Sequence, residues 1–155
     1  MSIVKKTYEA KQMIDIVKST AIGRYIWDEI NNNSKSNVIN IGFTFNESVL
    51  GSGNRGLARI NNNNEIDIII DADRTRNPVE TALIFVHEAS HVLMKLNKDY
   101  SCGQRITQEK YARSMESEMW EQLGKPSIEN DKSWMWELRH PSSSASIQTL
   151  LRDCW

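Results

Sequence analysis

The segment with the strongest consequence for the fold is ALIFVHEASHVLMKL, residues 82–96. As a helix it is apolar in almost every direction, and such a helix has to be covered by other elements on all sides. Two histidines and a glutamate nevertheless stand in its middle. Because burial of an unpartnered imidazole or carboxylate is costly, we expect these three side chains to share a partner.

Two long helices are predicted around this segment. Asn77 is placed as an N-cap and Pro78 as the first residue of a helix that extends to about residue 98. A loop at 100–104 separates this helix from a second one, which is predicted over about 107–123 and ends at a glycine.

The whole chain predicts an α+β fold in a single domain, residues 1–155. Alternating β-branched residues at 37–45 predict a strand, and 57–60 and 65–71 predict a β-hairpin around an asparagine-rich turn. We therefore expect a short antiparallel hairpin or sheet, followed by the histidine-bearing helix and the second long helix. Apolar periodicity at 5–31 predicts one or two N-terminal helices. A helical turn at 131–139 and a last short helix at 146–155 are also expected.

Charge and hydropathy argue against several classes of partner. The chain has 19 basic and 20 acidic residues without a basic stripe, so we expect no nucleic-acid partner. No run approaches the roughly 20 apolar residues of a membrane span, and the start of the chain lacks the apolar core of a secretory signal. Cys102 and Cys154 lack CxxC spacing and are predicted to be free thiols.

The polar residues within the apolar segment form an HExxH motif. His87 and His91 are four residues apart, so they lie one turn apart on the same helix face, with Glu88 beside them. Two imidazoles at this spacing converge on one zinc ion, and the glutamate is placed to activate a water molecule. The motif predicts Zn²⁺ bound by His87 and His91, with Glu88 as the catalytic base.

Catalytic zinc has three protein ligands, so a further ligand is required. The longer form of the motif would place a histidine at position 97, which is Asn97. A glutamate on the second helix is therefore expected. If the two helices are antiparallel and the second starts near Thr107, its return to the level of the zinc falls at 113–116. Glu116 fits best. Glu109, on the same face, is the runner-up, or it forms a hydrogen bond to a ligand histidine without binding the zinc itself.

The other candidate residues have more ordinary predicted roles. Glu118, Glu121 and His140 are predicted to be in solvent, and Tyr111, Trp120, Trp134 and Trp136 in the core. Asp71 and Asp73 are predicted to be at a strand end and its turn, and no role follows from the sequence for Arg74 and Arg76.

The motif and the helix after it resemble a known family over about residues 65–125. VHEASHVL followed by EKYARSMESEMWEQLG is similar to the HExxH effector metallopeptidases carried by bacterial type III and Rhs-type toxin systems. These show a glutamate, then Tyr-Ala, then a glutamate followed by asparagine, before a glycine-containing helix end. The chain supplies Glu109, Tyr111, Ala112 and Glu116. Ser117 stands where the asparagine is expected, and Trp120 lies where a basic residue is usual.

The resemblance implies a zincin-like, gluzincin-type metallopeptidase that cuts a protein substrate. Zinc would be held by His87, His91 and a helix-borne glutamate, and Glu88 would carry out the proteolysis. The resemblance further implies a secreted effector or toxin that stays in the bacterial cytoplasm until a dedicated system delivers it into a target cell. An immunity protein or an export chaperone is the partner expected in that setting.

Two alternatives stay open. The same zinc chemistry can cut an amide of peptidoglycan, which would make the protein an antibacterial amidase. In the other alternative the metal is structural, the protein is a zinc-stabilised binding module, and Cys102 supplies the fourth ligand.

Overall fold

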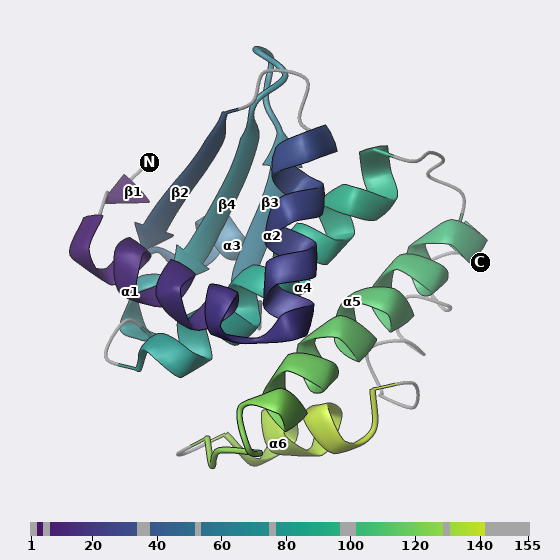
Figure 1. Ribbon diagram of the computed structural model, residues 1–155. Coiled ribbons are helices and arrows are strands. Elements are labelled where there is room, and N and C mark those ends of the chain that lie inside the picture. Colours follow the sequence, from purple (N-terminus) through teal and green to yellow (C-terminus); the bar gives the residue numbers. More distant parts are fainter. Residues whose placement is uncertain are drawn as a thin grey trace.

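The computed structural model describes most of the chain as one sheet with helices packed against it (Figure 1). The described residues are 3–4, 7–33, 38–51, 54–74, 77–96, 102–128 and 131–141, without the side chains of 3–4, 7, 95–96 and 102–105. The α+β class predicted from the sequence is confirmed.

The sheet has four strands in the order β1-β2-β4-β3. The strands are β1 (Ile3–Val4), β2 (Ile39–Thr44), β3 (Gly56–Ile60) and β4 (Ile66–Asp71). The predicted hairpin is confirmed as the antiparallel pair β3 and β4. The sheet is mixed rather than antiparallel throughout, because β2 pairs with β4 in parallel. The isoleucine-rich β4 is largely buried, as expected of a strand with a neighbour on each side.

The hairpin turn is built by asparagines, as predicted. The Asn61 side-chain oxygen accepts hydrogen bonds from the backbone N–H groups of Asn63 at 2.9 Å and Glu65 at 3.0 Å. Asn64 has φ 60°, in the left-handed region that asparagine tolerates better than most residues. The turn thereby fixes the pairing of Ile60 with Ile66 and of the residues beyond.

The helices agree with most of the sequence prediction. They are α1 (Thr7–Ser19), α2 (Ala21–Asn33), α3 (Glu47–Leu50), the 3₁₀ turn η1 (Ala72–Arg74), α4 (Pro78–Leu96), α5 (Cys102–Gln122) and α6 (Lys132–Arg139). The short α3 was not predicted, and α5 begins earlier than the predicted 107. The last helix, predicted at 146–155, lies outside the described residues. Within the described ranges, no helix combines the length and apolarity needed to cross a membrane.

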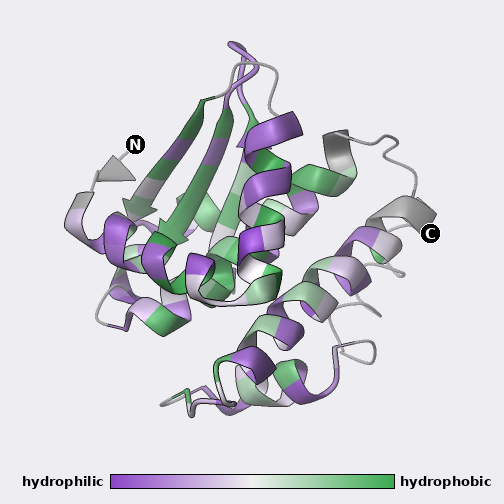
Figure 2. Ribbon diagram, viewed as in Figure 1, coloured by the Kyte–Doolittle hydropathy of each residue, from purple (hydrophilic) through white to green (hydrophobic). Residues whose placement is uncertain are grey.

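Helix α4 lies at the centre of the molecule, as its composition predicts. It contacts α1, α2, α5, β3 and β4, and residues 82–86 are each at most 3% exposed. Figure 2 shows hydrophobic residues concentrated in α4 and the strands, whereas α5 mixes both kinds. The predicted N-cap is confirmed, because the Asn77 side-chain oxygen accepts from the Val79 N–H at 3.1 Å.

The first residue of β3 lies directly against α4. A Cβ atom on Gly56 would stand 2.7 Å from Cγ2 of Ile84 and 3.0 Å from Cγ of Glu88. Both distances are shorter than ordinary van der Waals contact. Glycine is therefore required at position 56 for the edge strand to pack onto the helix at the level of the motif glutamate.

Gly56→Ala is expected to lower the free energy of unfolding by about 1–3 kcal/mol, because the added methyl group overpacks this contact. Urea unfolding followed by circular dichroism measures the change. Arg59→Ala, on the same strand and with a side chain that is 43% exposed, serves as the control and should change stability by about 0.5 kcal/mol or less. Equal losses in the two variants would contradict the close packing at Gly56.

Candidate metal centre

His87 and His91 point their Nε2 atoms at the same place. The two Nε2 atoms are 3.2 Å apart, and the ring planes meet at 62° with centroids 4.9 Å apart. Both residues lie on α4, one helical turn apart, so the backbone of a single rigid element sets this geometry.

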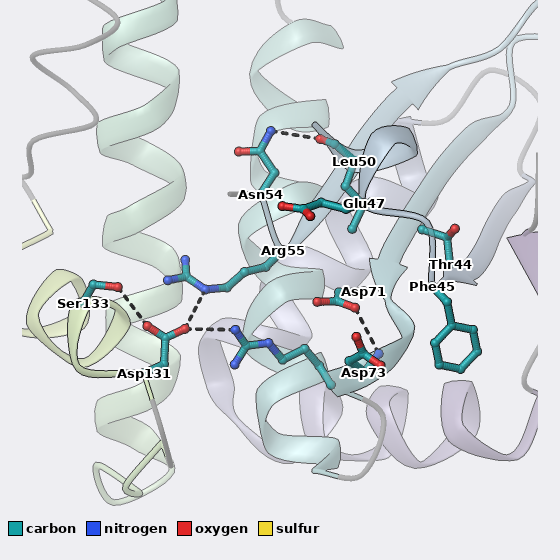
Figure 3. Close-up of a pocket in the computed structure, with 11 residues that line it drawn as sticks. Thr44, Phe45, Glu47, Leu50, Asn54, Arg55, Asp71, Asp73, Asp131 and Ser133 are labelled. Atoms are coloured by element: carbon teal, nitrogen blue, oxygen red, sulfur yellow. Dashed lines mark hydrogen bonds and ion pairs between the residues drawn. The ribbon is translucent and has the colours of Figure 1, made fainter. Parts of the chain in front are cut away.

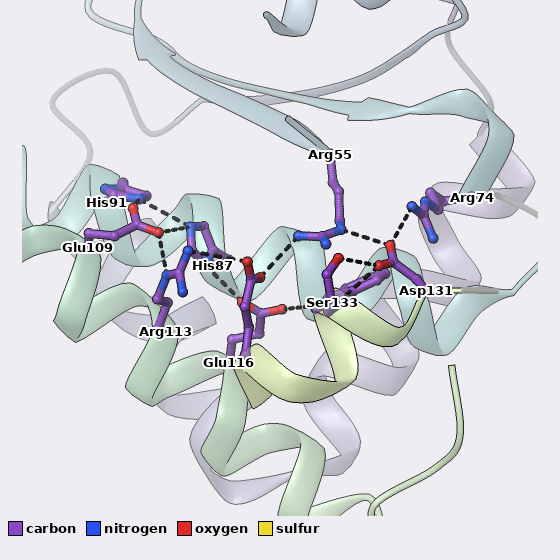
Figure 4. A network of polar contacts seen from close by, with 11 residues as sticks. Arg55, Arg74, His87, His91, Glu109, Arg113, Glu116, Asp131 and Ser133 are labelled. Carbon is purple, nitrogen blue, oxygen red and sulfur yellow. Dashed lines mark hydrogen bonds and ion pairs between the residues drawn. The ribbon is translucent and has the colours of Figure 1, made fainter. Parts of the chain in front are cut away.

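Glu109 brings a carboxylate to the same point from α5. Its Oε2 lies 2.9 Å from Nε2 of His91, and its Oε1 lies 3.5 Å from Nε2 of His87. Figure 4 shows this carboxylate facing both rings. Two imidazole nitrogens and one carboxylate from two neighbouring helices thus converge on one small volume.

The spacing of these donor atoms fits a zinc ion. Ligand atoms held tetrahedrally at about 2.0–2.2 Å from zinc stand roughly 3.3–3.6 Å from one another. The separations of 3.2, 2.9 and 3.5 Å among the three groups lie close to that range. Two imidazoles and a carboxylate are also a donor set typical of catalytic zinc.

Glu88 is buried beside the histidines and is incompletely satisfied. The residue is 9% exposed, and its Oε2 has no hydrogen-bond partner among the described residues. A carboxylate oxygen of Glu88 and one ring nitrogen of each histidine lie within 4.8 Å of one another. Burial raises the pKa of Glu88 above its usual range, although the two neighbouring imidazoles oppose the shift. A buried carboxylate with a free oxygen and a raised pKa is suited to accept and return a proton.

Glu116 lies on the opposite side of the His87 ring. Its Oε1 accepts a hydrogen bond from Nδ1 of His87 at 2.8 Å, and its Oε2 accepts one from Nε1 of Trp134 at 2.5 Å. A proton held on Nδ1 leaves the Nε2 lone pair available, which is the usual arrangement for a metal-binding histidine. Glu116 therefore orients His87 from outside, while Glu109 faces the Nε2 atoms.

The positions of the two glutamates relative to the histidines differ from the sequence prediction because of where α5 begins. The sequence prediction started the second helix near 107, whereas α5 starts at Cys102, and α4 ends at Leu96. An earlier start moves the level of the histidines from 113–116 to about 109, because each helical residue rises about 1.5 Å. Glu116, two turns further along α5, then reaches the far side of the ring.

Comparison with protein-family models, curated proteins and solved structures found no match.

The histidines of α4 and the glutamates of α5 shift one another's pKa values. Burial alone would lower the pKa of His87, but the carboxylates of Glu109 and Glu116 outweigh it and raise that pKa well above its ordinary value. Burial would likewise raise the pKa of Glu109, yet contacts with the two histidines hold it far below the usual range. Positive charge between these groups is therefore strongly favoured, and a divalent cation would supply it.

A chain of ion pairs extends from this centre to the N-terminus of α6. Arg113 donates through Nε to Oε1 of Glu109 at 2.8 Å, and its Nη2 lies 3.5 Å from Glu137 of α6. Arg55, just before β3, lies 3.4 Å from both Glu137 and Asp131. Figure 4 shows Arg113, Arg55 and Asp131 in one row, and these contacts link α5, α6 and the start of β3 by charge.

A cavity of about 410 Å³ adjoins the far end of this row. It lies where β2 and β4 end, and Figure 3 shows Arg55 and Asp131 on one side of it and Asp71 and Asp73 on the other. Its lining consists of Thr44, Phe45, Glu47, Leu50, Asn54, Arg55, Asp71, Asp73, Arg74, Asp131 and Ser133. The ion pairs thus join the histidine cluster to an open, polar space at the end of the sheet.

Asp131 forms ion pairs with both arginines that line this cavity, Arg55 and Arg74. Burial alone would raise its pKa, but the Trp134 backbone N–H, the Ser133 hydroxyl and the guanidinium groups of Arg55 and Arg74 hold it at about 2. Arg74 Nη2 lies 2.9 Å from the carboxylate. Asp131 is also the N-cap of α6, since its side chain accepts from the Trp134 N–H at 3.1 Å.

Asp131→Asn is expected to reduce stability in a way that depends on pH. Because the folded-state pKa is depressed from 3.8 to about 2, the charged form stabilises the fold above pH 3.8, and this contribution is lost as the pH falls through about 2. Near pH 6 the wild type should exceed the variant by about 1 kcal/mol in free energy of unfolding, with the cap itself retained by asparagine. Urea unfolding at several pH values measures the difference. A gap that stayed constant down to about pH 2 would contradict the role of the charge.

The remaining predicted residues are placed as follows. Glu118, Glu121 and His140 are exposed, as predicted, and Trp120 and Trp134 are buried. Trp136 was predicted to be in the core but is 44% exposed and stacks on His140. Tyr111 is half-buried, and Asp71 accepts from the Asp73 N–H in the predicted turn. Arg76, Cys154 and the side chain of Cys102 lie outside the described residues.

The sequence did not identify Arg113 and Trp134 as residues that contact the glutamates of the centre. Arg113 lies four residues after Glu109, and this spacing is a detectable sign of a helical ion pair. Trp134 carries no comparable local sign, since its partner Glu116 belongs to another helix.

Proposed function

We propose that this protein is a zinc-dependent metallopeptidase that hydrolyses peptide bonds in a protein substrate. The observation that carries the proposal is the convergence of His87, His91 and Glu109 beside Glu88, whose Oε2 has no hydrogen-bond partner among the described residues. In this proposal His87, His91 and Glu109 hold Zn²⁺, and Glu116, the ligand favoured by sequence alone, orients His87.

The residues of the chain divide the catalytic work. Bound zinc supplies Lewis acidity, which polarises the substrate carbonyl and makes an attacking water more acidic. Glu88 takes the proton of that water on its free carboxylate oxygen and later donates it to the leaving amine. The raised pKa of Glu88 favours this exchange, because the carboxyl group has to hold the proton between the two steps.

The edge of the sheet offers a place for an extended substrate. Strand β3 stands at the end of the strand order, and its first residue, Gly56, packs against Glu88. A peptide that pairs with this edge as an additional strand would run past the catalytic carboxylate. Main-chain pairing of this kind favours peptide substrates over isolated small amides.

The biological setting follows only from the resemblance to bacterial effector metallopeptidases. It implies an effector or toxin that is delivered into a target cell and has an immunity protein or a chaperone as partner. A peptidoglycan amidase would use the same centre, so substrate screening has to include both polymers.

The test combines metal analysis with substrate screening. Elemental analysis of the purified protein is expected to give about one zinc per chain, by the usual count for a catalytic site. Incubation with a denatured protein mixture should generate new N-termini, and a chelator should stop this until zinc is added back. No zinc after reconstitution would refute the metal site. Zinc-dependent release from peptidoglycan fragments without cleavage of proteins would favour the amidase, and bound zinc without either activity would favour the binding module.

A further inference from the structure

Helix α6 reaches the metal centre through one buried side chain. Trp134 is 1% exposed, and its indole Nε1 donates to Oε2 of Glu116 at 2.5 Å. We propose that Trp134 is a positioning residue of the metal centre, through which α6 fixes the imidazole of His87. The proposal rests on the proposed zinc site and adds to it an element more than forty residues after the motif.

Both oxygens of Glu116 are committed in this arrangement. Oε1 accepts from His87, and Oε2 accepts from Trp134. With a donor on each oxygen the plane of the carboxylate is fixed, and so is the ring that it holds. Glu116 is only 7% exposed, so loss of the indole donor would leave Oε2 without its described donor in a site where water has little access.

Trp134 is itself held firmly. The guanidinium of Arg55 lies 4.5 Å from the centre of the indole ring, and that of Arg74 lies 5.2 Å from it. Both arginines bind Asp131, which caps the helix that carries Trp134. The indole is therefore fixed by cation–π contacts on its ring and by a capped backbone beneath it.

Two other contacts join α6 to the ligand-bearing helix. The Ser117 hydroxyl donates to the carbonyl oxygen of Leu138 at 2.6 Å. Glu137 lies 3.5 Å from the guanidinium of Arg113, which holds Glu109. Helix α6 is thus connected to both α5 glutamates of the centre. Trp134 contacts Glu116 directly, and Glu137 is connected to Glu109 through Arg113.

The same helix provides a matched control. Trp136 lies two residues after Trp134, is 44% exposed and stacks on His140 rather than on the centre. Trp134→Phe removes the indole donor while retaining most of the apolar volume, and Trp136→Phe makes the same chemical change outside the network.

The experiment measures zinc affinity by competition with a chromophoric chelator, starting from the metal-free proteins. Trp134→Phe is expected to bind zinc about 10-fold more weakly than the wild type, within the range seen for partners of metal-binding histidines, and Trp136→Phe about as tightly as the wild type. The visible spectrum of the cobalt-substituted protein should change in Trp134→Phe only, because the spectrum reports ligand geometry rather than fold stability.

A second readout works even if Trp134→Phe folds poorly. In wild-type protein labelled with ¹⁵N, the Trp134 indole N–H signal should move when zinc is added, and Glu116→Gln should shift it in the metal-free protein. Wild-type zinc affinity and an unchanged cobalt spectrum in Trp134→Phe would overturn the positioning role while leaving the metal site intact. An indole signal unaffected by zinc in a wild type that binds zinc would also overturn it. A wild type that binds no zinc would overturn the metal site itself and the positioning role with it.

Discussion

A Glu88→Gln protein is expected to bind zinc as the wild type does but to cleave its substrate about 10²–10⁴ times more slowly. The carboxamide retains the shape of the side chain and cannot accept the proton of the attacking water. Glu88 lies against Gly56 of β3, and one of its carboxylate oxygens lies within 4.8 Å of a ring nitrogen of each histidine. In the proposed site the two Nε2 atoms are faced by Glu109 and not by Glu88. The comparison requires metal content and initial rates measured on the same preparations.

A matched control for this prediction is Glu118→Gln, the same chemical change at an exposed position of α5. It should leave both zinc content and rate close to those of the wild type. A Glu88→Gln protein that turned over substrate at the wild-type rate would show that another group serves as the base. A variant that lost its zinc would instead indicate that Glu88 is a ligand.

The second large effect is expected at the two glutamates of α5. Glu109→Ala should weaken zinc binding more than Glu116→Ala, because the carboxylate of Glu109 faces both Nε2 atoms, whereas that of Glu116 contacts Nδ1 of His87. Loss of the Glu116 carboxylate, which only holds His87, should weaken zinc binding roughly 10–100-fold, and loss of the ligand Glu109 should weaken it more than that. Chelator competition on the three metal-free proteins gives the ranking.

The opposite ranking, with Glu116→Ala the weaker binder, would return the third ligand to the residue that the sequence favours. Equal and small losses would show that neither carboxylate is a ligand. Thermal unfolding of the metal-free variants separates these outcomes from misfolding, since Glu116 is buried between His87 and Trp134.

The central part of the fold could be predicted because each of its elements has a local sign. The apolar segment within α4, the cap at Asn77 and the asparagine turn of the hairpin all act through residues close to one another in sequence. The parallel pairing of β2 with β4 has no such sign, because it is decided by which strands bury the isoleucines of β4. The exposed Trp136 was misplaced for a similar reason, since composition does not show which face of α6 meets α5.

The candidate site was predictable in the same uneven way. The HExxH spacing places His87, Glu88 and His91 on one helix, so the structure only had to confirm their convergence. Which α5 glutamate faces them depends on where that helix starts, and residues 102–104, which were predicted from the sequence to form a loop, are the first residues of α5. The contact of Trp134 with Glu116 joins two helices and cannot be derived from either one alone.

The close approach at Gly56 also acts as a check on strand register. A slip of one residue in the pairing of β3 with β4 would bring Arg55 or Leu57 to the place where only a hydrogen atom fits against Glu88. Every such misaligned hairpin carries a Cβ atom toward Ile84 and Glu88, so it docks on α4 less favourably than the correctly paired hairpin. The one residue in β3 that has no side chain thus favours the correct alignment of the sheet edge and at the same time brings that edge against Glu88.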